Sequence, residues 1–197
     1  MLECHYKFTE KNIDNLFVKK INEDFAELIL RESFGFKTSI HGNDEDEPDL
    51  LFDEKEWFEI TLICDSKKRN NLVQRIKSRN FKSDDVEEEL LTMIEERIKD
   101  KTTKKYINIH SNLCLICPVP MIDWVADFSD IELIYTSKKQ KCFNNLYRKY
   151  VESGTFKDIF IIVPSIDASW TLIDLKNKRF NFDVDLTNEN YPYYIMQ

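Results

Sequence analysis

Glycine is scarce in this sequence, with three residues among 197. The chain has no glycine-rich loop of the kind that cradles phosphates, and no serine-centred nucleophile elbow is visible. The histidines are also few. His5, His41 and His110 lie in different predicted elements, without the spacing of metal ligands, and lone histidines are usually structural or exposed.

Long apolar runs are missing as well. None reaches the length that spans a membrane, and the first residues, MLECHYKFTEKN, lack the basic-then-apolar pattern of a signal peptide. We therefore expect a cytoplasmic protein with no membrane partner. The length and the 42% hydrophobic content fit a single domain over 1–197, because no internal repeat or low-complexity linker interrupts the chain.

Cysteine occurs five times, mostly in apolar surroundings. An odd number in such a setting favours buried thiols over a disulfide framework. Cys114 and Cys117 form a C-x-x-C, but the run NLCLICPVP is typical of a strand. An offset of three residues in a strand puts two side chains on opposite faces, so zinc or redox chemistry is not predicted for this pair.

The net charge of -8 disfavours uniform attraction to nucleic acid. The charges are unevenly spread, however. Residues 66–83 hold seven basic residues and no acids, 137–149 hold five and no acids, and the acids concentrate at 43–59 and 84–96. Such blocks are commonly solvated faces, but they also allow a basic groove beside an acidic pocket.

Hydrophobic spacing predicts an α/β protein with a mixed central sheet. The expected core covers about 9–164, and a C-terminal hairpin follows at about 169–186. The predicted elements are a helix at 9–34, strands at 36–40, 49–52 and 57–64, a partly helical basic stretch to about residue 80, a helix from Asp84 to about Tyr106, a strand at 112–120, a helix at 137–153 and a strand at 156–164.

Two carboxylates stand out in the stretch EPDLLFDEKEWFEIT. Asp49 opens a short apolar run, and Glu59 lies between Phe58 and Ile60. If 49–52 and 57–64 pair as a hairpin, the two acids come near each other at one end of the sheet, where a hard divalent cation would balance their repulsion. The alternative is that Asp49 caps a turn and Glu59 pairs with a nearby lysine, and the spacing favours neither.

These residues resemble the motif of the PD-(D/E)XK nuclease superfamily, the fold of many restriction endonucleases. Pro48-Asp49 is followed by Glu59-Ile60-Thr61 on the next hydrophobic strand. The order of a leading helix, a three-strand meander, a helix and a buried strand is also similar, over about residues 9–120. The resemblance implies that Asp49, Glu59 and the carbonyl of Ile60 bind Mg²⁺ or Mn²⁺.

The family often adds a glutamate from the leading helix. The candidates here are Glu23, Asp24 and Glu27. At 100° per residue Glu27 and Asp24 fall on the inward arc of the helix and Glu23 falls outside it, so Glu27 is preferred. The alternative for Glu27 is a salt bridge to Arg31 at i+4.

The sequence departs from the family at the last motif position, where Thr61 replaces the usual lysine. A hydroxyl cannot supply the positive charge that stabilises the transition state. Lysines that could reach the site follow the strand or end the next helix. They are Lys67, Lys68, Lys101, Lys104 and Lys105.

We therefore expect a Mg-dependent endonuclease, a hydrolase of nucleic-acid phosphodiester bonds, with DNA the favoured substrate over RNA. The catalytic candidates are Asp49, Glu59, Thr61 and Glu27. Phosphate contacts are expected from Lys67, Lys68, Arg69, Lys101, Lys104 and Lys105. The resemblance also allows a homodimer, because duplex cleavage needs two sites. The alternative is a catalytically inactive nuclease fold that binds nucleic acid or protein in a mobile-element or defence system.

Overall fold

A computed structural model describes residues 18–43, 47–77, 83–103, 110–118, 138–164, 170–176 and 179–184. Its helices are α2 (Lys19–Phe34), α3 (Ser66–Lys77), α4 (Ser83–Lys101), α7 (Lys138–Leu146) and a π-helical continuation, η1 (Tyr147–Glu152). Its strands are β1 (Ser39–His41), β2 (Leu50–Phe52), β3 (Glu56–Leu62), β4 (Asn112–Ile116), β5 (Ile159–Pro164), β6 (Trp170–Asp174) and β7 (Arg179–Val184). Within these ranges, no helix is both long and apolar enough to cross a membrane.

The seven strands form one sheet in which they lie in chain order. β1, β2 and β3 form an antiparallel meander, β4 and β5 continue it in parallel, and β6 and β7 close it as an antiparallel pair. The predicted α/β class with a mixed central sheet is confirmed, and so is the pairing of the C-terminal hairpin.

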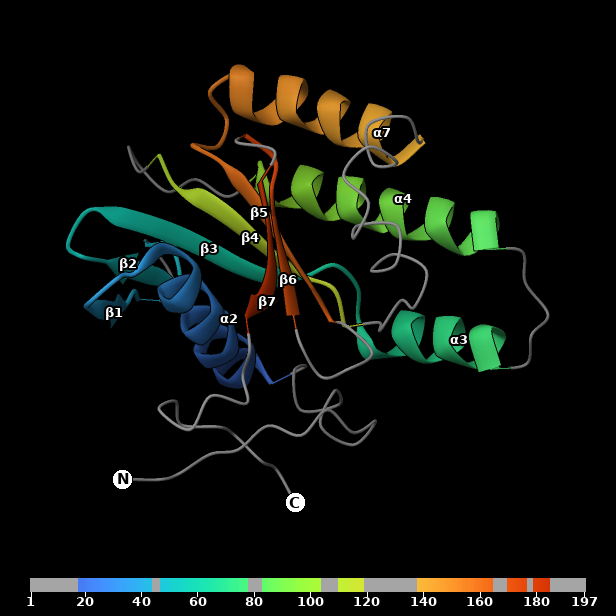
Figure 1. Cartoon of the computed structure of the whole chain (residues 1–197), viewed down its shortest axis with the longest axis horizontal. Helices are drawn as coiled ribbons and strands as arrows, with labels where there is room; N and C mark the ends of the chain where they lie inside the picture. Colours follow the sequence, from blue (N-terminus) through green and yellow to red (C-terminus); the bar gives the residue numbers. More distant parts are fainter. Residues whose placement is uncertain are drawn as a thin grey trace.

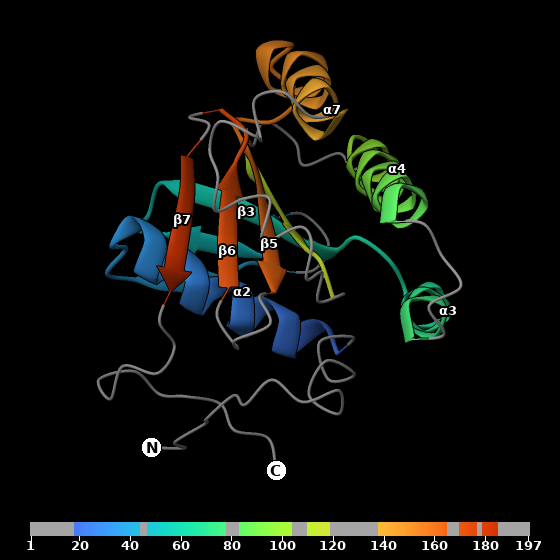
Figure 2. The ribbon, with the colours of Figure 1, turned by 45° about the vertical axis from the view of Figure 1, so that its right-hand side comes forward.

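The helices cover the two faces of this sheet unequally. Helix α2 crosses one face, while α3, α4 and α7 lie on the other (Figure 1, Figure 2). Each face has its own hydrophobic cluster. Phe25, Ile29 and Leu30 of α2 pack on Phe58 and Ile60. The opposite cluster joins side chains of α3, α4, α7 and η1 to alternate residues of β4, β5 and β6, including Leu72, Leu90, Ile94, Leu113, Leu115, Phe143 and Ile161.

Strand β4 is buried along its whole length, as a parallel strand covered on both faces must be. Cys114 belongs to the cluster under α2 and Cys117 to the cluster under α4. This confirms that the two thiols of the C-x-x-C face opposite sides of the sheet. Cys64, Cys114, Cys117 and Cys142 are all free thiols, and Cys4 lies outside the described residues.

A tight turn joins β2 to β3, as the spacing of the two predicted strands indicates. Asp53 and Glu54 adopt left-handed backbone conformations, with φ of 46° and 58°. The carboxylate of Asp53 accepts hydrogen bonds from the N–H groups of Lys37 and Thr38, both at 3.0 Å. These bonds tie the turn to the segment that leads into β1, and they fix the meander that carries the candidate acids.

The buried side of α2 differs from the predicted one. Buried residues of the helix include Asn22, Glu23 and Ala26, whereas Ile21 and Leu28 are only half-buried. The prediction that Glu23 lies outside the inward arc is therefore wrong. The prediction considered only the apolar residues of the helix. In the structure the helix also turns a polar strip, which includes Glu23 and Asp24, toward the end of β1 and the start of β2.

Candidate metal centre

Asp49 lies where the ladder between β2 and β3 ends. The register of the two strands pairs Leu50 with Phe58, and its continuation by one residue brings Asp49 level with Glu59. Asp49 is buried, and its Oδ2 accepts a hydrogen bond from the N–H of Ile60 at 2.7 Å. A side-chain oxygen thus takes the place of a backbone acceptor at this end of the sheet.

The same register brings Pro48 level with Ile60. Proline has no N–H, so Pro48 cannot donate to the carbonyl of Ile60 as a ladder residue would. This gives a local reason why the Ile60 carbonyl is suited to another partner. The Asp49 carboxylate and the backbone of Ile60 thus lie together at one strand end.

A cation already lies beside Asp49. The ammonium Nζ of Lys19 is 3.3 Å from Asp49 Oδ1 and 3.5 Å from Glu23 Oε1. Burial raises the pKa of Glu23, and the nearby carboxylate of Asp49 raises it further. The helix acid that shares the electrostatic surroundings of Asp49 is therefore Glu23.

Glu59 points to the other face of the sheet. Its neighbours Phe58 and Ile60 pack under α2, so strand alternation turns Glu59 and Thr61 toward α4. Glu59 is 1% exposed, and the ammonium of Lys101, the last residue of α4, donates a hydrogen bond to its Oε1. A lysine amine is thus present on the same strand face as Thr61, the position where the family motif carries its lysine.

Glu27 makes its contacts with residues of α2 and β1. Its Oε1 accepts a hydrogen bond from the hydroxyl of Ser39 and lies 3.4 Å from Nη1 of Arg31. The i+4 salt bridge given as the alternative for Glu27 is therefore confirmed. Its Oε2 lies 3.5 Å from Nε2 of His41, so the structure groups Glu27 with His41 and not with the two motif acids.

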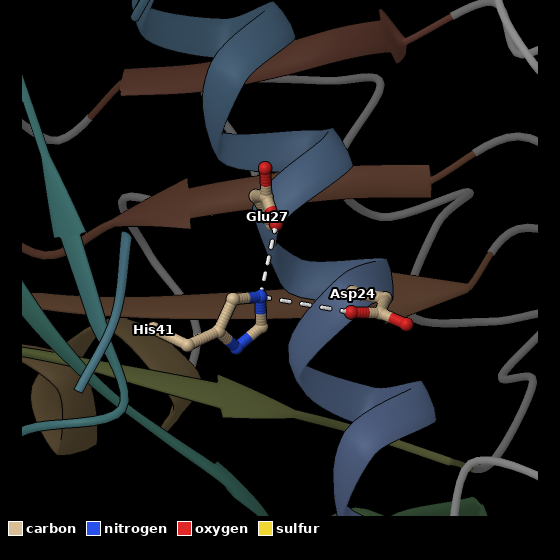
Figure 3. Close-up of side chains that lie close together, drawn as sticks. All are labelled: Asp24, Glu27 and His41. Atoms are coloured by element: carbon tan, nitrogen blue, oxygen red, sulfur yellow. Dashed lines mark ion pairs between the residues drawn. The ribbon is translucent and has the colours of Figure 1, made fainter. Parts of the chain in front are cut away.

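His41 is a candidate ligand that sequence spacing missed. Asp24, Glu27 and His41 offer ligand atoms that all lie within 4.8 Å of one another, and neither Asp49 nor Glu59 belongs to this group (Figure 3). Asp24 and Glu27 lie three residues apart on one helix face, which was the available signal. The histidine comes from a strand 14 residues beyond Glu27, and no local pattern connects the two.

The residues predicted to contact phosphates occupy different environments. Lys67 and Lys68 are exposed at the start of α3. Arg69 is 5% exposed, and its Nη1 donates to Asn70 at 2.9 Å, which argues against a phosphate contact by this side chain. Lys104 and Lys105 lie outside the described residues.

Gly42 couples the loop before Asp49 to β1. Its N–H donates to the carbonyl of Asp49 at 3.0 Å, and a Cβ added at this position would lie 2.0 Å from the carbonyl oxygen of Pro48. We expect Gly42→Ala to displace the Pro48-Asp49 segment and to lower the free energy of unfolding by about 1–3 kcal/mol. Urea denaturation measures the loss.

Gly154→Ala is the comparison variant for Gly42→Ala. Gly154 has a φ of 80°, and no atom lies within 4 Å of the position that an added Cβ would take, so its alanine variant carries backbone strain without a collision. A loss for Gly42→Ala no larger than for Gly154→Ala would contradict the close approach to Pro48.

A comparison with protein-family models, with curated proteins and with solved structures found no match for this chain. The functional assignment therefore depends on the residues of the site and on their geometry.

Proposed function

We propose that this chain is a metal-dependent nuclease that hydrolyses phosphodiester bonds of nucleic acid, DNA in preference to RNA, and that it resembles the PD-(D/E)XK enzymes. The order of its elements supports this proposal. A leading helix, an antiparallel meander of three strands, two helices and a parallel fourth strand follow one another, which is the order expected of a restriction-endonuclease-like core apart from the additional helix α3.

The residues present fit a hard divalent cation. Carboxylate and carbonyl oxygens are the ligands that Mg²⁺ and Mn²⁺ prefer. Asp49 and the Ile60 carbonyl would hold the ion beside Glu23 of α2, and Glu59 would have to turn from Lys101 to join them. When bound, such an ion activates water and stabilises charge on a phosphoryl oxygen. Lys19, whose ammonium now lies between Asp49 and Glu23, would have to move aside.

The contact between Lys101 and Glu59 carries the proposal. A lysine in this family orients the nucleophilic water and stabilises developing negative charge, and Thr61 cannot do either. Lys101 reaches Glu59 from α4, 42 residues away in the chain, on the strand face where the motif lysine would lie. We infer that Lys101 supplies the positive charge that the motif lacks.

The exposed lysines at the start of α3 would approach the phosphate backbone of the substrate. Lys67 and Lys68 follow directly after β3, the strand that carries Glu59 and Thr61. Contacts of this kind position a duplex without reading its sequence. They would also make binding weaken with added salt.

A cleavage assay with matched variants tests the proposal. Labelled single- and double-stranded DNA and RNA are incubated with the chain and Mg²⁺ or Mn²⁺, with EDTA as the metal-free control. We expect metal-dependent cleavage that slows at least about 100-fold in Asp49→Asn and in Glu59→Gln, because each variant removes a charged ligand. Glu54→Gln, an exposed glutamate in the β2–β3 turn, should cleave like the original chain.

The second candidate is a nuclease fold without catalysis that binds nucleic acid or a protein. One observation favours it: lysine ammonium groups lie against both motif acids, Lys19 against Asp49 and Lys101 against Glu59. Buried acids held by lysines can serve stability alone. Equal, metal-independent traces of cleavage in all variants, together with salt-dependent nucleic-acid binding, would favour this candidate over the enzyme.

A further inference from the structure

The imidazole of His41 lies between two carboxylates of α2 at a separation that suits a shared ion. Its Nε2 is 3.5 Å from Glu27 Oε2 and 3.8 Å from Asp24 Oδ1 (Figure 3). Both distances exceed the range of about 2.7–3.2 Å of an N–H···O hydrogen bond. Two ligand atoms on one tetrahedral ion with bonds of about 2.0–2.1 Å lie roughly 3.3–3.4 Å apart. The two distances from His41 Nε2 are close to that spacing, and the three ligand atoms lie within 4.8 Å of one another.

Neighbouring residues contact the atoms of His41 and Glu27 that would not bind the ion, as residues that orient metal ligands do. His41 Nδ1 lies 3.5 Å from Oε2 of Glu23, so the second ring nitrogen faces a carboxylate. Oε1 of Glu27 is engaged by Ser39 and Arg31, which turns Oε2 toward the histidine. Pairing of a ligating histidine with a carboxylate through its other nitrogen is the usual arrangement at metal sites.

Glu23 adds a buried carboxylate beside the histidine. The residue is 9% exposed, and its buried Oε1 accepts no hydrogen bond. Lys19 lies 3.5 Å from that oxygen, and His41 lies 3.5 Å from the other. A buried carboxylate with no hydrogen bond to one oxygen is unfavourable unless positive charge lies close by.

We propose that Asp24, Glu27 and His41 bind one first-row transition-metal ion, with Zn²⁺ the favoured occupant, and that Glu23 orients the histidine. Imidazole together with carboxylates suits zinc better than magnesium. The ion would join the edge strand β1 to α2. Its ligands are distinct from Asp49, Glu59 and Ile60, so this site goes beyond the proposed nuclease and does not require that activity.

Calorimetric titration of Zn²⁺ into the full chain tests the site, and Asp49→Asn serves as the background so that the other centre does not contribute. We expect one Zn²⁺ per chain. His41→Gln should weaken binding at least about 100-fold, and Glu23→Gln about 10-fold. His110→Gln changes an exposed histidine elsewhere in the chain and should bind Zn²⁺ like the background.

Two further readouts separate ligation from folding. Co²⁺ bound in place of Zn²⁺ should show the strong visible absorption of a tetrahedral ion, and His41→Gln should lose it. Zn²⁺ should also raise the melting temperature of the background chain, because it binds the folded state. Asp24→Asn, at a half-buried residue, repeats the test if His41→Gln fails to fold by circular dichroism.

The site is disproved if the background chain binds no Zn²⁺, or if His41→Gln and His110→Gln bind it equally. Loss of nucleic-acid cleavage in Asp49→Asn with retained Zn²⁺ binding would separate the two centres. Failure of the nuclease proposal alone would leave the zinc titration unchanged.

Discussion

Replacing Lys101 by methionine is expected to lower the free energy of unfolding by about 3–5 kcal/mol. Its ammonium contacts a carboxylate that is 1% exposed, while the lysine side chain itself is 13% exposed. Methionine keeps much of the packing volume but removes the charge. Glu59 then stays in a buried position without this contact, which is the costly way to break a buried ion pair. Urea denaturation followed by circular dichroism measures the loss.

Lys99→Met is the matched control for Lys101→Met. Lys99 lies two residues earlier on α4 and is exposed, so its replacement should change stability by no more than about 0.5 kcal/mol. The double variant Glu59→Gln with Lys101→Met should recover part of the stability, because it removes both charges together. Equal losses for the Lys101 and Lys99 variants would show that the contact contributes nothing.

The same lysine allows a test that distinguishes structure from catalysis. In the Lys101→Met background, Thr61→Lys restores an ammonium group two residues from Glu59 on the same strand face. We expect Lys101→Met to slow cleavage at least about 100-fold and Thr61→Lys to restore part of the rate. Glu59→Gln should recover stability in that background but no cleavage. A Thr61→Lys variant that regains stability without any rate would limit Lys101 to a structural role.

A second large effect on stability is expected from two buried carboxyl groups, those of Asp158 and Asp174, which do not belong to the candidate metal centre. Asp158 precedes β5 and Asp174 ends β6, where Phe160 pairs with Asp174. Both acids are 5% exposed. Burial raises the pKa of Asp158 to about 7, and the neighbouring carboxylate of Asp174 contributes to this rise, while the N–H groups of Ile159 and Lys176 bond to Asp158 Oδ1 and oppose it.

This raised pKa makes stability fall as pH rises. Between an unfolded pKa of about 4 and the folded pKa of about 7, the folded chain binds more protons than the unfolded chain. The contribution of protonated Asp158 to stability is complete below pH 4 and is lost as the pH rises past 7. Asp158→Asn keeps an oxygen that can accept the two N–H bonds and removes the charge. We expect it to exceed the original chain in stability by up to about 4 kcal/mol above pH 7, with little difference at pH 4.

Denaturation at a series of pH values from 3 to 9 measures this difference. Asp174→Asn should show the same trend, because it removes the neighbouring carboxylate that helps to raise the pKa of Asp158. Asp53→Asn is a control for which we expect the opposite pH dependence of stability, because hydrogen bonds from the N–H groups of Thr38 and Lys37 lower the pKa of Asp53. Its contribution is present at neutral pH and is lost as the pH falls. A constant difference between Asp158→Asn and the original chain would contradict the buried pair.

Local patterns in the sequence were sufficient for most elements of the fold. Helix α4 follows its predicted start closely, and β4 is buried on both faces as its apolar run indicates. The short spacer DEKE predicted the hairpin of β2 and β3, which sets Asp49 level with Glu59. These features depend on residues within a few positions of one another, where period and turn chemistry determine the backbone.

The partners of the candidate ligands were decided by the tertiary structure. Lys101 meets Glu59 across 42 residues, because the crossover from β3 to β4 lays the end of α4 over one face of the sheet. His41 meets Asp24 and Glu27 because α2 docks with a polar strip toward β1. The sequence determined which residues carry charge and which strands hold them. Only the packing of helices on the sheet decided which charges meet, since side-chain contacts between distant segments follow from docking and not from local spacing.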